Sequence, residues 1–201
     1  MSANFVYLAS GSPRRRELLA QIGVPFQVLD VTVDEARLPR EAPDAYVVRL
    51  ARQKADAGWR VRPLRTPSPV LAADTTVVLD GEILGKPNDR SDGEQMLRAL
   101  GGRTHEVLTA VAVATPQGLI SRTSRSEVTF RAISGAEAHD YWATGEPRDK
   151  AGGYAIQGGA AIFVADLKGS YSGVMGLPLF ETSELLVQAG VPHWSWIRDE
   201  H

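Results

Sequence analysis

Three arginines in succession, Arg14 to Arg16, follow Ser12 and Pro13 at the expected first turn of a helix. Ser12 suits the N-cap and Pro13 the first helical position, because proline lacks one of the N–H groups that are unbonded there. Each cation in this turn costs about 0.3–1 kcal/mol against the helix dipole unless an anion lies beside it. The spacing indicates a phosphate site, with Arg15 facing inward and Arg16 in solvent. The alternative is a basic surface turn that is paired with nearby acids.

Two further ionisable residues stand in segments that are otherwise apolar. Lys54 continues a helical stripe of apolar residues, and Asp74 lies in the middle of the strand-like run Val70–Leu79. Because lysine is rarely buried unpaired, Lys54 either extends its stem to the edge of the protein or brings its ammonium to an acid or a phosphate. Asp74 must be hydrogen-bonded, ion-paired or bound to a metal. A structural aspartate remains the alternative at this position.

The rest of the pattern indicates the elements that position these residues. Strands and helices alternate early and strands cluster later, which favours a mixed α/β sheet flanked by helices. We expect helices that begin near 13 and 43 and helices at 91–100, 134–144 and 180–189, and strands near 5–8, 26–29, 70–79, 82–84, 107–114, 127–130 and 163–164. Ser91 and Ser134 each precede a glutamate with capping-box spacing. The glycine-rich segment Asp149–Gly159 is a weak sign of a ligand loop, and Gly169–Pro178 reads as a second irregular segment.

Composition places the chain among ordinary globular proteins. It has 201 residues, of which 43% are hydrophobic and 23% charged, and its formal net charge of −2 argues against a nucleic-acid-coating surface. The absence of cysteine excludes disulfides and thiolate catalysis, and the histidines lack metal-ligand spacing. No run reaches the ~18 apolar residues of a membrane span, and the N-terminus has no signal-peptide pattern. We therefore expect one cytoplasmic domain over residues 1–201, with neither membrane nor nucleic acid as a partner.

Several of these segments together resemble the Maf family of nucleotide pyrophosphatases. The run Leu8–Leu19 has the pattern Leu-Ala-Ser-x-Ser-Pro-Arg-Arg-x-x-Leu-Leu. Further segments look like family segments in family order: Val48–Ala55, Ala73–Thr75, Gly85–Pro87, Asp149–Gly152, Tyr154–Gly158 and Gly176–Pro178. The similarity extends from Tyr7 to about Leu186. Residues Ser172–Met175 depart from the family pattern, which concerns loop detail rather than the reaction.

The resemblance implies both an architecture and a reaction. It implies an elongated mixed α/β fold similar to the inosine triphosphate pyrophosphatases, with a central cleft between two lobes, and a homodimer. The implied reaction is hydrolysis of a nucleoside triphosphate between its α and β phosphates, which yields a monophosphate and pyrophosphate. By resemblance, the triphosphate is held by several cations and a hydroxyl, as its charge requires. These residues are Ser10, Arg14, Arg15, Lys54 and Lys86.

Two carboxylates complete the implied catalytic set, in which Lys54 is also included. By resemblance, Asp74 matches the family's proton acceptor for the attacking water, and Glu35 matches a carboxylate that helps to hold a divalent metal or that water. Oxygen ligands suit Mg²⁺ or Mn²⁺, which neutralises phosphate charge and acidifies water. Glu35 and Asp74 are thus both candidate metal ligands. Whether Asp74 is base, ligand or both stays open, because the sequence does not give its distance from Glu35.

Three positions imply the substrate subgroup. Family members that act on dTTP and UTP carry Arg, Thr and Gln at the places of Arg15, Thr75 and Gln157, whereas the 7-methyl-GTP subgroup differs at the latter two. A glutamine amide can donate one hydrogen bond and accept another, which suits the adjacent carbonyl and N–H of a pyrimidine. The resemblance therefore implies a dTTP/UTP pyrophosphatase, with modified pyrimidine nucleotides as further candidate substrates. The alternative is a nucleotide-sensing regulator of cell division and septum formation without significant turnover, and the intact catalytic set favours the enzyme.

Overall fold

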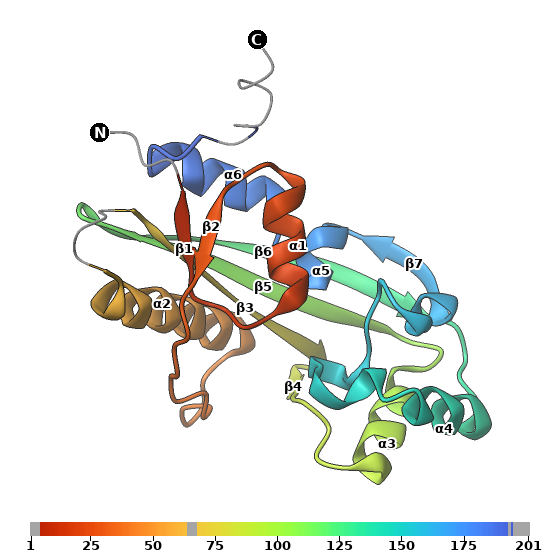
Figure 1. The fold of residues 1–201 in the computed structure, drawn as a ribbon. Coiled ribbons are helices and arrows are strands. Elements are labelled where there is room, and N and C mark those ends of the chain that lie inside the picture. The colour runs from red at the N-terminus through yellow and green to blue at the C-terminus, as the bar shows by residue number, and fades with distance from the viewer. Residues whose placement is uncertain (1–4, 64–67, 193, 195–201) are drawn as a thin grey trace. The chain divides into compact units, whose positions relative to one another are not determined.

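The computed structural model describes residues 5–63, 68–192 and 194 (Figure 1). Its strands are β1 (Val6–Leu8), β2 (Phe26–Val28), β3 (Val70–Leu79), β4 (Glu82–Leu84), β5 (Thr104–Thr115), β6 (Gly118–Phe130) and β7 (Val164–Lys168). The α-helices are α1 (Pro13–Gln21), α2 (Pro43–Val61), α3 (Arg90–Leu100), α4 (Gly135–Ala143), α5 (Tyr171–Met175) and α6 (Leu179–Gln188). Short 3-10 helices are η1 (Glu146–Asp149), η2 (Ala151–Gly153) and η3 (Gly159–Phe163).

The strands form one sheet of mixed direction. Six follow the order β2-β1-β3-β5-β6-β7, and β4 pairs with β3 beside this path. β1 is parallel to β2 and β3, whereas the β3–β4 and β6–β7 pairs are antiparallel. The predicted mixed α/β sheet with helices around it is therefore confirmed.

The chain divides into two compact units. Unit 1 contains the described residues of Met1–Asp74, Thr109–Ser124 and Gly176–His201, and unit 2 contains Thr75–Leu108 and Arg125–Met175. The boundaries fall inside β3, β5 and β6, so each of these strands contributes residues to both units. That residues 1–201 form one domain stays a prediction.

In unit 1, the two strands that follow β1 in the sequence lie on opposite sides of it in the sheet. The first crossover leads from β1 through α1 to β2 on one side, and the second leads through α2 to β3 on the other. Leu8 at the end of β1 pairs with Val28 and with Leu71. The loops that follow β1 and β2 therefore leave the sheet at one edge, and β3 continues past Leu71 at the same edge. Open α/β sheets bind ligands at such a switch point, outside the carboxyl ends of the strands.

Helix α1 begins at Pro13 and buries Leu18 and Leu19, as its pattern predicts. Ser12 is the N-cap residue with an extended backbone, although among the described residues its hydroxyl makes no capping hydrogen bond. Gly23 follows the helix with φ 64°, the left-handed conformation that glycine adopts without steric cost.

Helix α2 packs closely against the sheet of unit 1. The apolar stripe of this helix, in which Lys54 stands, includes Val47, Leu50, Ala51 and Gly58, and these four residues are buried. A Cβ atom added to Gly58 would lie 2.7 Å from Val70 Cγ1, so only glycine permits this approach of the helix to β3. This contact sets the distance between α2 and β3, the strand that carries Asp74.

Unit 2 has its own hydrophobic core, to which the parts of β3, β5 and β6 that belong to this unit contribute residues. Its largest fully buried side chains include Phe130 and Phe163, and the buried residues of the cluster are Val77, Leu79, Leu97, Leu100, Val107, Val128, Phe130, Ala138, Tyr141, Tyr154, Ile156, Ala160 and Phe163. The expected strands at 70–79 and 82–84 are present and form an antiparallel hairpin, with positive φ at Asp80 and Gly81. The predicted capping box of Ser134 at α4 is also present.

Three local predictions are wrong. The N-cap of α3 is Asp89 rather than Ser91, since the Asp89 carboxylate accepts a 2.9 Å hydrogen bond from Asp92 N. Strand β6 begins at Gly118, and its polar residues hid an alternation in which Ser124 and every second residue after it are buried. The segment Gly169–Pro178 contains helix α5 instead of being irregular throughout.

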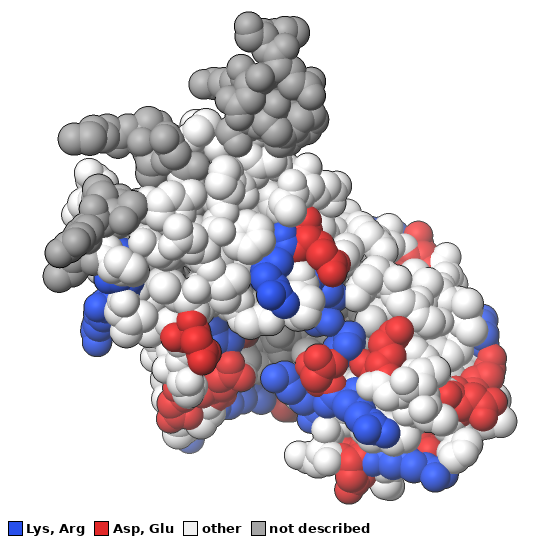
Figure 2. Space-filling model, viewed as in Figure 1, with Lys and Arg blue, Asp and Glu red and all other residues white. Residues whose placement is uncertain are grey.

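Charged side chains of both signs are interspersed on the face that Figure 2 shows, as expected for a chain with little net charge. Among the described residues, every helix is too short or too polar to cross a bilayer. The prediction about the N-terminus falls partly on residues 1–4, outside the described residues.

Candidate active site

One ammonium joins two carboxylates that are far apart in the sequence. Lys54 Nζ lies 2.6 Å from Glu35 Oε1 and 2.7 Å from Asp74 Oδ1. Lys54 comes from α2, Asp74 from β3 and Glu35 from the loop between β2 and α2. We call these three residues the Lys54 cluster. Of the two alternatives for Lys54, the structure selects the contact with acids, because only 15% of its side chain is exposed.

Asp74 is the buried carboxylate of the Lys54 cluster. Its side chain is 10% exposed, whereas that of Glu35 is 51% exposed. Burial raises the pKa of Asp74 above its ordinary value, and the charges of Lys54 and Arg15 oppose this shift. A buried carboxylate with a raised pKa accepts a proton more readily than one in water, which suits a general base. The ion pair also explains how the strand tolerates the charge.

Arg15 faces the same cluster from α1. Its Nε donates to the Gly176 carbonyl at 2.7 Å and its Nη1 to Ser10 Oγ at 3.2 Å. Burial lowers the pKa of Arg15, and the negative charge of Asp74 opposes that effect. Gly176 has φ 120°, a conformation open chiefly to glycine, and this turn directs its carbonyl to the guanidinium. The prediction that Arg15 points inward is confirmed.

The start of α1 has the features of an anion site. Ser10 is 8% exposed, and its hydroxyl accepts a 3.3 Å hydrogen bond from Ser12 N, which shapes the turn before the helix. Arg14 is half-buried, and its charge acts on Arg15. Arg16 is exposed, as predicted. The positive end of a helix dipole, next to two cations, attracts phosphate.

The structure thus brings six predicted site residues together in unit 1. These are Ser10, Arg14, Arg15, Glu35, Lys54 and Asp74. Their charges are three cations and two carboxylates, an excess of one positive charge. Such a group can bind a polyanion and still present a carboxylate as a base.

The other three predicted site residues belong to unit 2. Thr75 is half-buried on β3, directly after Asp74, whereas Lys86 and Gln157 are exposed in irregular segments. The segments that carry the latter two are linked within unit 2, because Gly152 N donates to the Gly85 carbonyl at 2.9 Å.

Buried aromatic residues hold the segment that contains Gln157. The Tyr154 hydroxyl lies 2.7 Å from Nε2 of the buried His105, and Ala155 N donates to the Tyr141 hydroxyl at 3.1 Å. Burial lowers the pKa of His105 to about 4, so this histidine is neutral near pH 7. These contacts fix the backbone just before Gln157.

Sequence reasoning missed several residues that hold the site. The Gly176 carbonyl, and the side chains of Glu41, Tyr46 and Arg49 around the loop of Glu35, were assigned no role. The available signal was their place in or near the family segments Val48–Ala55 and Gly176–Pro178. That signal marks a segment but does not give a partner.

The chemistry of the two carboxylates fits a hard divalent cation. Each has an oxygen within hydrogen-bonding distance of the same Nζ atom, and oxygen atoms are the ligands that such cations prefer. Within the described residues, His, Cys, Asp and Glu form no group of three or more that could hold a metal. Magnesium is commonly held by one or two carboxylates together with substrate phosphates.

Comparison with known proteins gives consistent relatives over nearly the whole chain. A family described as "Maf-like protein" matches residues 5–189. The dTTP/UTP pyrophosphatase of Saccharophagus degradans is 57% identical over 94% of this chain and 90% of its own length. That of Alkalilimnicola ehrlichii is 54% identical, over 94% and 96% respectively. Among solved structures, the Staphylococcus aureus Ham1 protein matches with a TM-score of 0.40 and 15% identity, over 65% of this chain and 72% of that one.

Proposed function

Because the chain belongs to the Maf family, we propose that it hydrolyses dTTP and UTP between the α and β phosphates, with a nucleoside monophosphate and pyrophosphate as products. The observation that carries this proposal is the Lys54 cluster beside the Arg15–Ser10 contact. Relatives at 52–57% identity carry the name dTTP/UTP pyrophosphatase. A nucleotide sensor without turnover is not favoured, since these relatives are named as enzymes.

The start of α1 supplies the phosphate contacts in this proposal. Ser10, Arg14 and Arg15 donate to the triphosphate oxygens at the positive end of the helix dipole. Arg15 already donates to Ser10 and to Gly176, so its guanidinium is held in place before substrate binds. Holding the phosphates in this way fixes the α phosphorus relative to Asp74.

Asp74 acts as general base in the proposed reaction. Its Oδ1 is bonded to Lys54, and its other oxygen, Oδ2, takes the proton from water as the water oxygen bonds to the α phosphorus. The bond from that phosphorus to the α–β bridging oxygen breaks, and pyrophosphate leaves with the bond's electron pair. Lys54 keeps Asp74 and Glu35 together during this step and offsets negative charge as it develops.

Glu35 and Asp74 are the residues that would hold Mg²⁺ or Mn²⁺. When bound, such an ion neutralises phosphate charge and lowers the pKa of water. The solvent-facing carboxylate of Glu35 and the buried one of Asp74 supply hard oxygen atoms for it. The Lys54 ammonium, which contacts both carboxylates, would also bind a phosphate oxygen of the substrate.

Residues of unit 2 are proposed to select the base. In the family pattern, Thr75 and Gln157 go with pyrimidine substrates, and Lys86 with triphosphate binding. The Gln157 amide can pair with the adjacent carbonyl and N–H of uracil or thymine. The held backbone before Gln157 makes such a contact directional.

Two further proposals concern the protein in the cell. The enzyme is proposed to be cytoplasmic and to form a homodimer. Light scattering of the purified chain tests the dimer, and cell fractionation tests the location.

The direct test is a product assay with purified protein, UTP and Mg²⁺ or Mn²⁺. The proposal requires UMP and pyrophosphate, with dTTP as a comparable substrate and CTP, GTP and 7-methyl-GTP as poorer ones. Formation of UDP and orthophosphate would overturn the reaction. A preference for 7-methyl-GTP would overturn the roles of Thr75 and Gln157 and leave the reaction standing. Omitting the metal or adding a chelator tests metal dependence in the same assay.

A further inference from the structure

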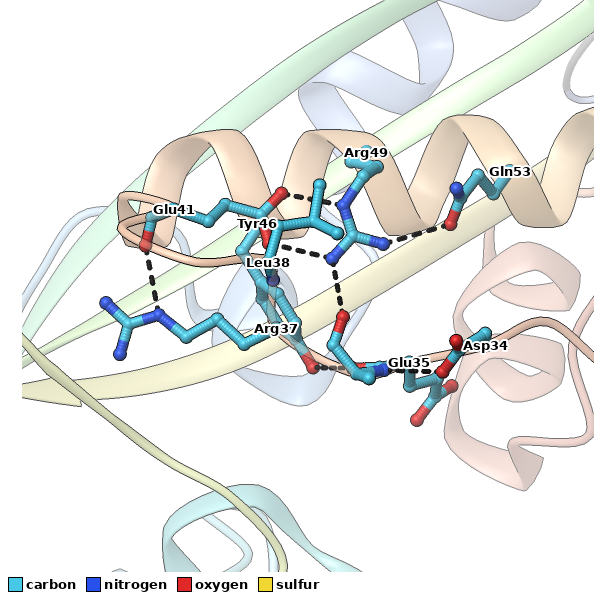
Figure 3. A network of polar contacts seen from close by, with 9 residues as sticks. Asp34, Glu35, Arg37, Leu38, Glu41, Tyr46, Arg49 and Gln53 are labelled. Carbon is cyan, nitrogen blue, oxygen red and sulfur yellow. Dashed lines mark hydrogen bonds and ion pairs between the residues drawn. The ribbon is translucent and has the colours of Figure 1, made fainter.

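Glu35 sits in a long segment without regular structure. Residues 29–42 connect β2 to α2 without a helix or a strand. Connections of this length that lack structure of their own are uncommon in compact proteins and are often functional. Their order depends on side-chain contacts, because the backbone forms no helix or ladder to satisfy its polar groups. Figure 3 shows that side chains of α2 supply such contacts.

Arg49 of α2 is the centre of these contacts. Its Nε lies 2.6 Å from Glu41 Oε1 and its Nη2 lies 2.7 Å from Glu41 Oε2, a bidentate pair. The same Nη2 donates to the Ala36 carbonyl at 3.0 Å, and Nη1 donates to Gln53 Oε1 at 3.2 Å. The hydrogen bonds from Arg49 lower the pKa of Glu41 to about 2. The Arg49 guanidinium thus binds the middle of the segment, at Ala36, and its end, at Glu41, to α2.

Glu41 also accepts hydrogen bonds from residues earlier in the same segment. Its Oε2 also accepts a 3.1 Å hydrogen bond from Leu38 N, and its carbonyl accepts one of 2.9 Å from Arg37 Nε. With 7% of its side chain exposed, Glu41 is largely shielded from water, whereas Leu38 is 52% exposed. The segment is therefore ordered by polar contacts rather than by a buried apolar anchor at Leu38.

Tyr46 holds the main chain of Glu35 itself. Its hydroxyl donates to the Glu35 carbonyl at 3.1 Å, and the Arg49 guanidinium carbon lies 5.5 Å from the centre of its ring. Burial raises the pKa of Tyr46, with Asp74 and Glu35 adding to the shift, so the hydroxyl stays protonated and donates. Tyr46 and Arg49 thus donate hydrogen bonds to two consecutive carbonyls, those of Glu35 and Ala36 respectively.

From this geometry we propose that Tyr46 and Arg49 are positioning residues, which hold the Glu35 carboxylate beside Lys54 and Asp74 by fixing its backbone to α2. The inference rests on the proposed function, in which Glu35 helps to bind a divalent metal. Glu35 also contacts Lys54 directly, and a phosphate or a metal competes for that contact. Helix α2 carries Lys54 as well as Tyr46 and Arg49. One rigid element therefore sets the position of Lys54 and, through the other two side chains, that of Glu35.

The experiment compares Tyr46→Phe and Arg49→Lys with Arg52→Lys as the matched control. Tyr46→Phe removes only the hydroxyl. Arg49→Lys keeps the charge but removes the planar guanidinium that donates to both Glu41 and Ala36. Arg52 lies on the same helix, is exposed, and donates to Ser121 Oγ at 3.2 Å, away from the loop of Glu35. Each full-length protein is measured for kcat and KM with UTP, for the half-saturating Mn²⁺ concentration, and for melting temperature. Backbone amide exchange of residues 30–42 is measured without nucleotide or metal.

Loss of outer contacts to a metal ligand typically costs 10–100-fold in metal affinity or activity. We expect Arg49→Lys to lower kcat or raise the half-saturating Mn²⁺ concentration by about tenfold or more, with KM for UTP within about threefold of the parent. Tyr46→Phe should act in the same direction and less strongly. Amide exchange should speed up in residues 30–42 in both variants and stay unchanged in Arg52→Lys.

Three results would overturn the proposal. One is unchanged exchange in residues 30–42 in both variants, and another is faster exchange with unchanged kcat and Mn²⁺ dependence. A fall in melting temperature that Arg52→Lys shares would assign the effect to the helix and would also overturn it. If the parent protein itself does not convert UTP to UMP, the proposed function fails, and the exchange data still decide whether the two residues hold the loop.

Discussion

Replacement of Arg15 by alanine should lower both catalytic efficiency and stability. The guanidinium makes two hydrogen bonds in the free protein, to Gly176 and Ser10. Hydrogen bonds of charged groups contribute about 1.5–3 kcal/mol, and we take the lower end because Arg15 is only half-buried. Relief of repulsion at the helix start returns about 0.3–1 kcal/mol. Since two hydrogen bonds are lost, the net loss is about 2–3 kcal/mol, which is a fall of about 4–12 °C in melting temperature for a chain of this size.

The activity of the same variant separates phosphate binding from a purely structural role. Loss of a charge-assisted phosphate contact should lower kcat/KM for UTP by about tenfold or more. Melting curves with and without UTP should show a smaller gain from the nucleotide than in the parent. Arg16→Ala is the control, because Arg16 is exposed on the same turn, and it should change neither quantity much. A destabilised Arg15→Ala protein with the kcat/KM of the parent would refute the phosphate role.

Three other predictions follow from single sites. Asp74→Asn should melt near the parent and lose about 10²–10⁴-fold in kcat, and a variant that melts normally and keeps its rate would show Asp74 to be structural. Gly58→Ala should destabilise by about 1–3 kcal/mol in chemical denaturation, because the new methyl group meets Val70 Cγ1 at 2.7 Å; unchanged stability would disprove that close approach. His105 has a folded pKa of about 4, below its usual 6.5, so the unfolded state binds more protons between these values and stability should fall as pH drops from 6.5 to 4, by about 3 kcal/mol. Melting of His105→Gln over that range should show a smaller loss, and an equal loss would reject this origin.

Local signals in the sequence were enough for most of the elements. Proline at the start of α1 and α2, the apolar run of β3 and the Asp80–Gly81 turn act over a few residues, and the structure follows them. The errors arose where a local signal competed with another. Asp89 took the capping role expected of Ser91, and the polar half of β6 hid its alternation.

The residue types of the site were predictable, whereas most of its contacts were not. A charged residue within an apolar stripe or strand needs a partner, which marked Lys54 and Asp74 before any geometry was known. Which partner it finds depends on packing, since Glu35, Lys54 and Asp74 come from three elements. The Arg15–Gly176 contact spans 161 residues of sequence, so no local pattern could indicate it.

The central claim is that water attacks the α phosphorus and that pyrophosphate leaves. The most direct measurement is turnover of UTP in ¹⁸O-labelled water, with the products analysed by ³¹P NMR and mass spectrometry. The proposed chemistry predicts one ¹⁸O atom in UMP and unlabelled pyrophosphate. Label in orthophosphate with UDP as the second product, or label in pyrophosphate with unlabelled UMP, would contradict it.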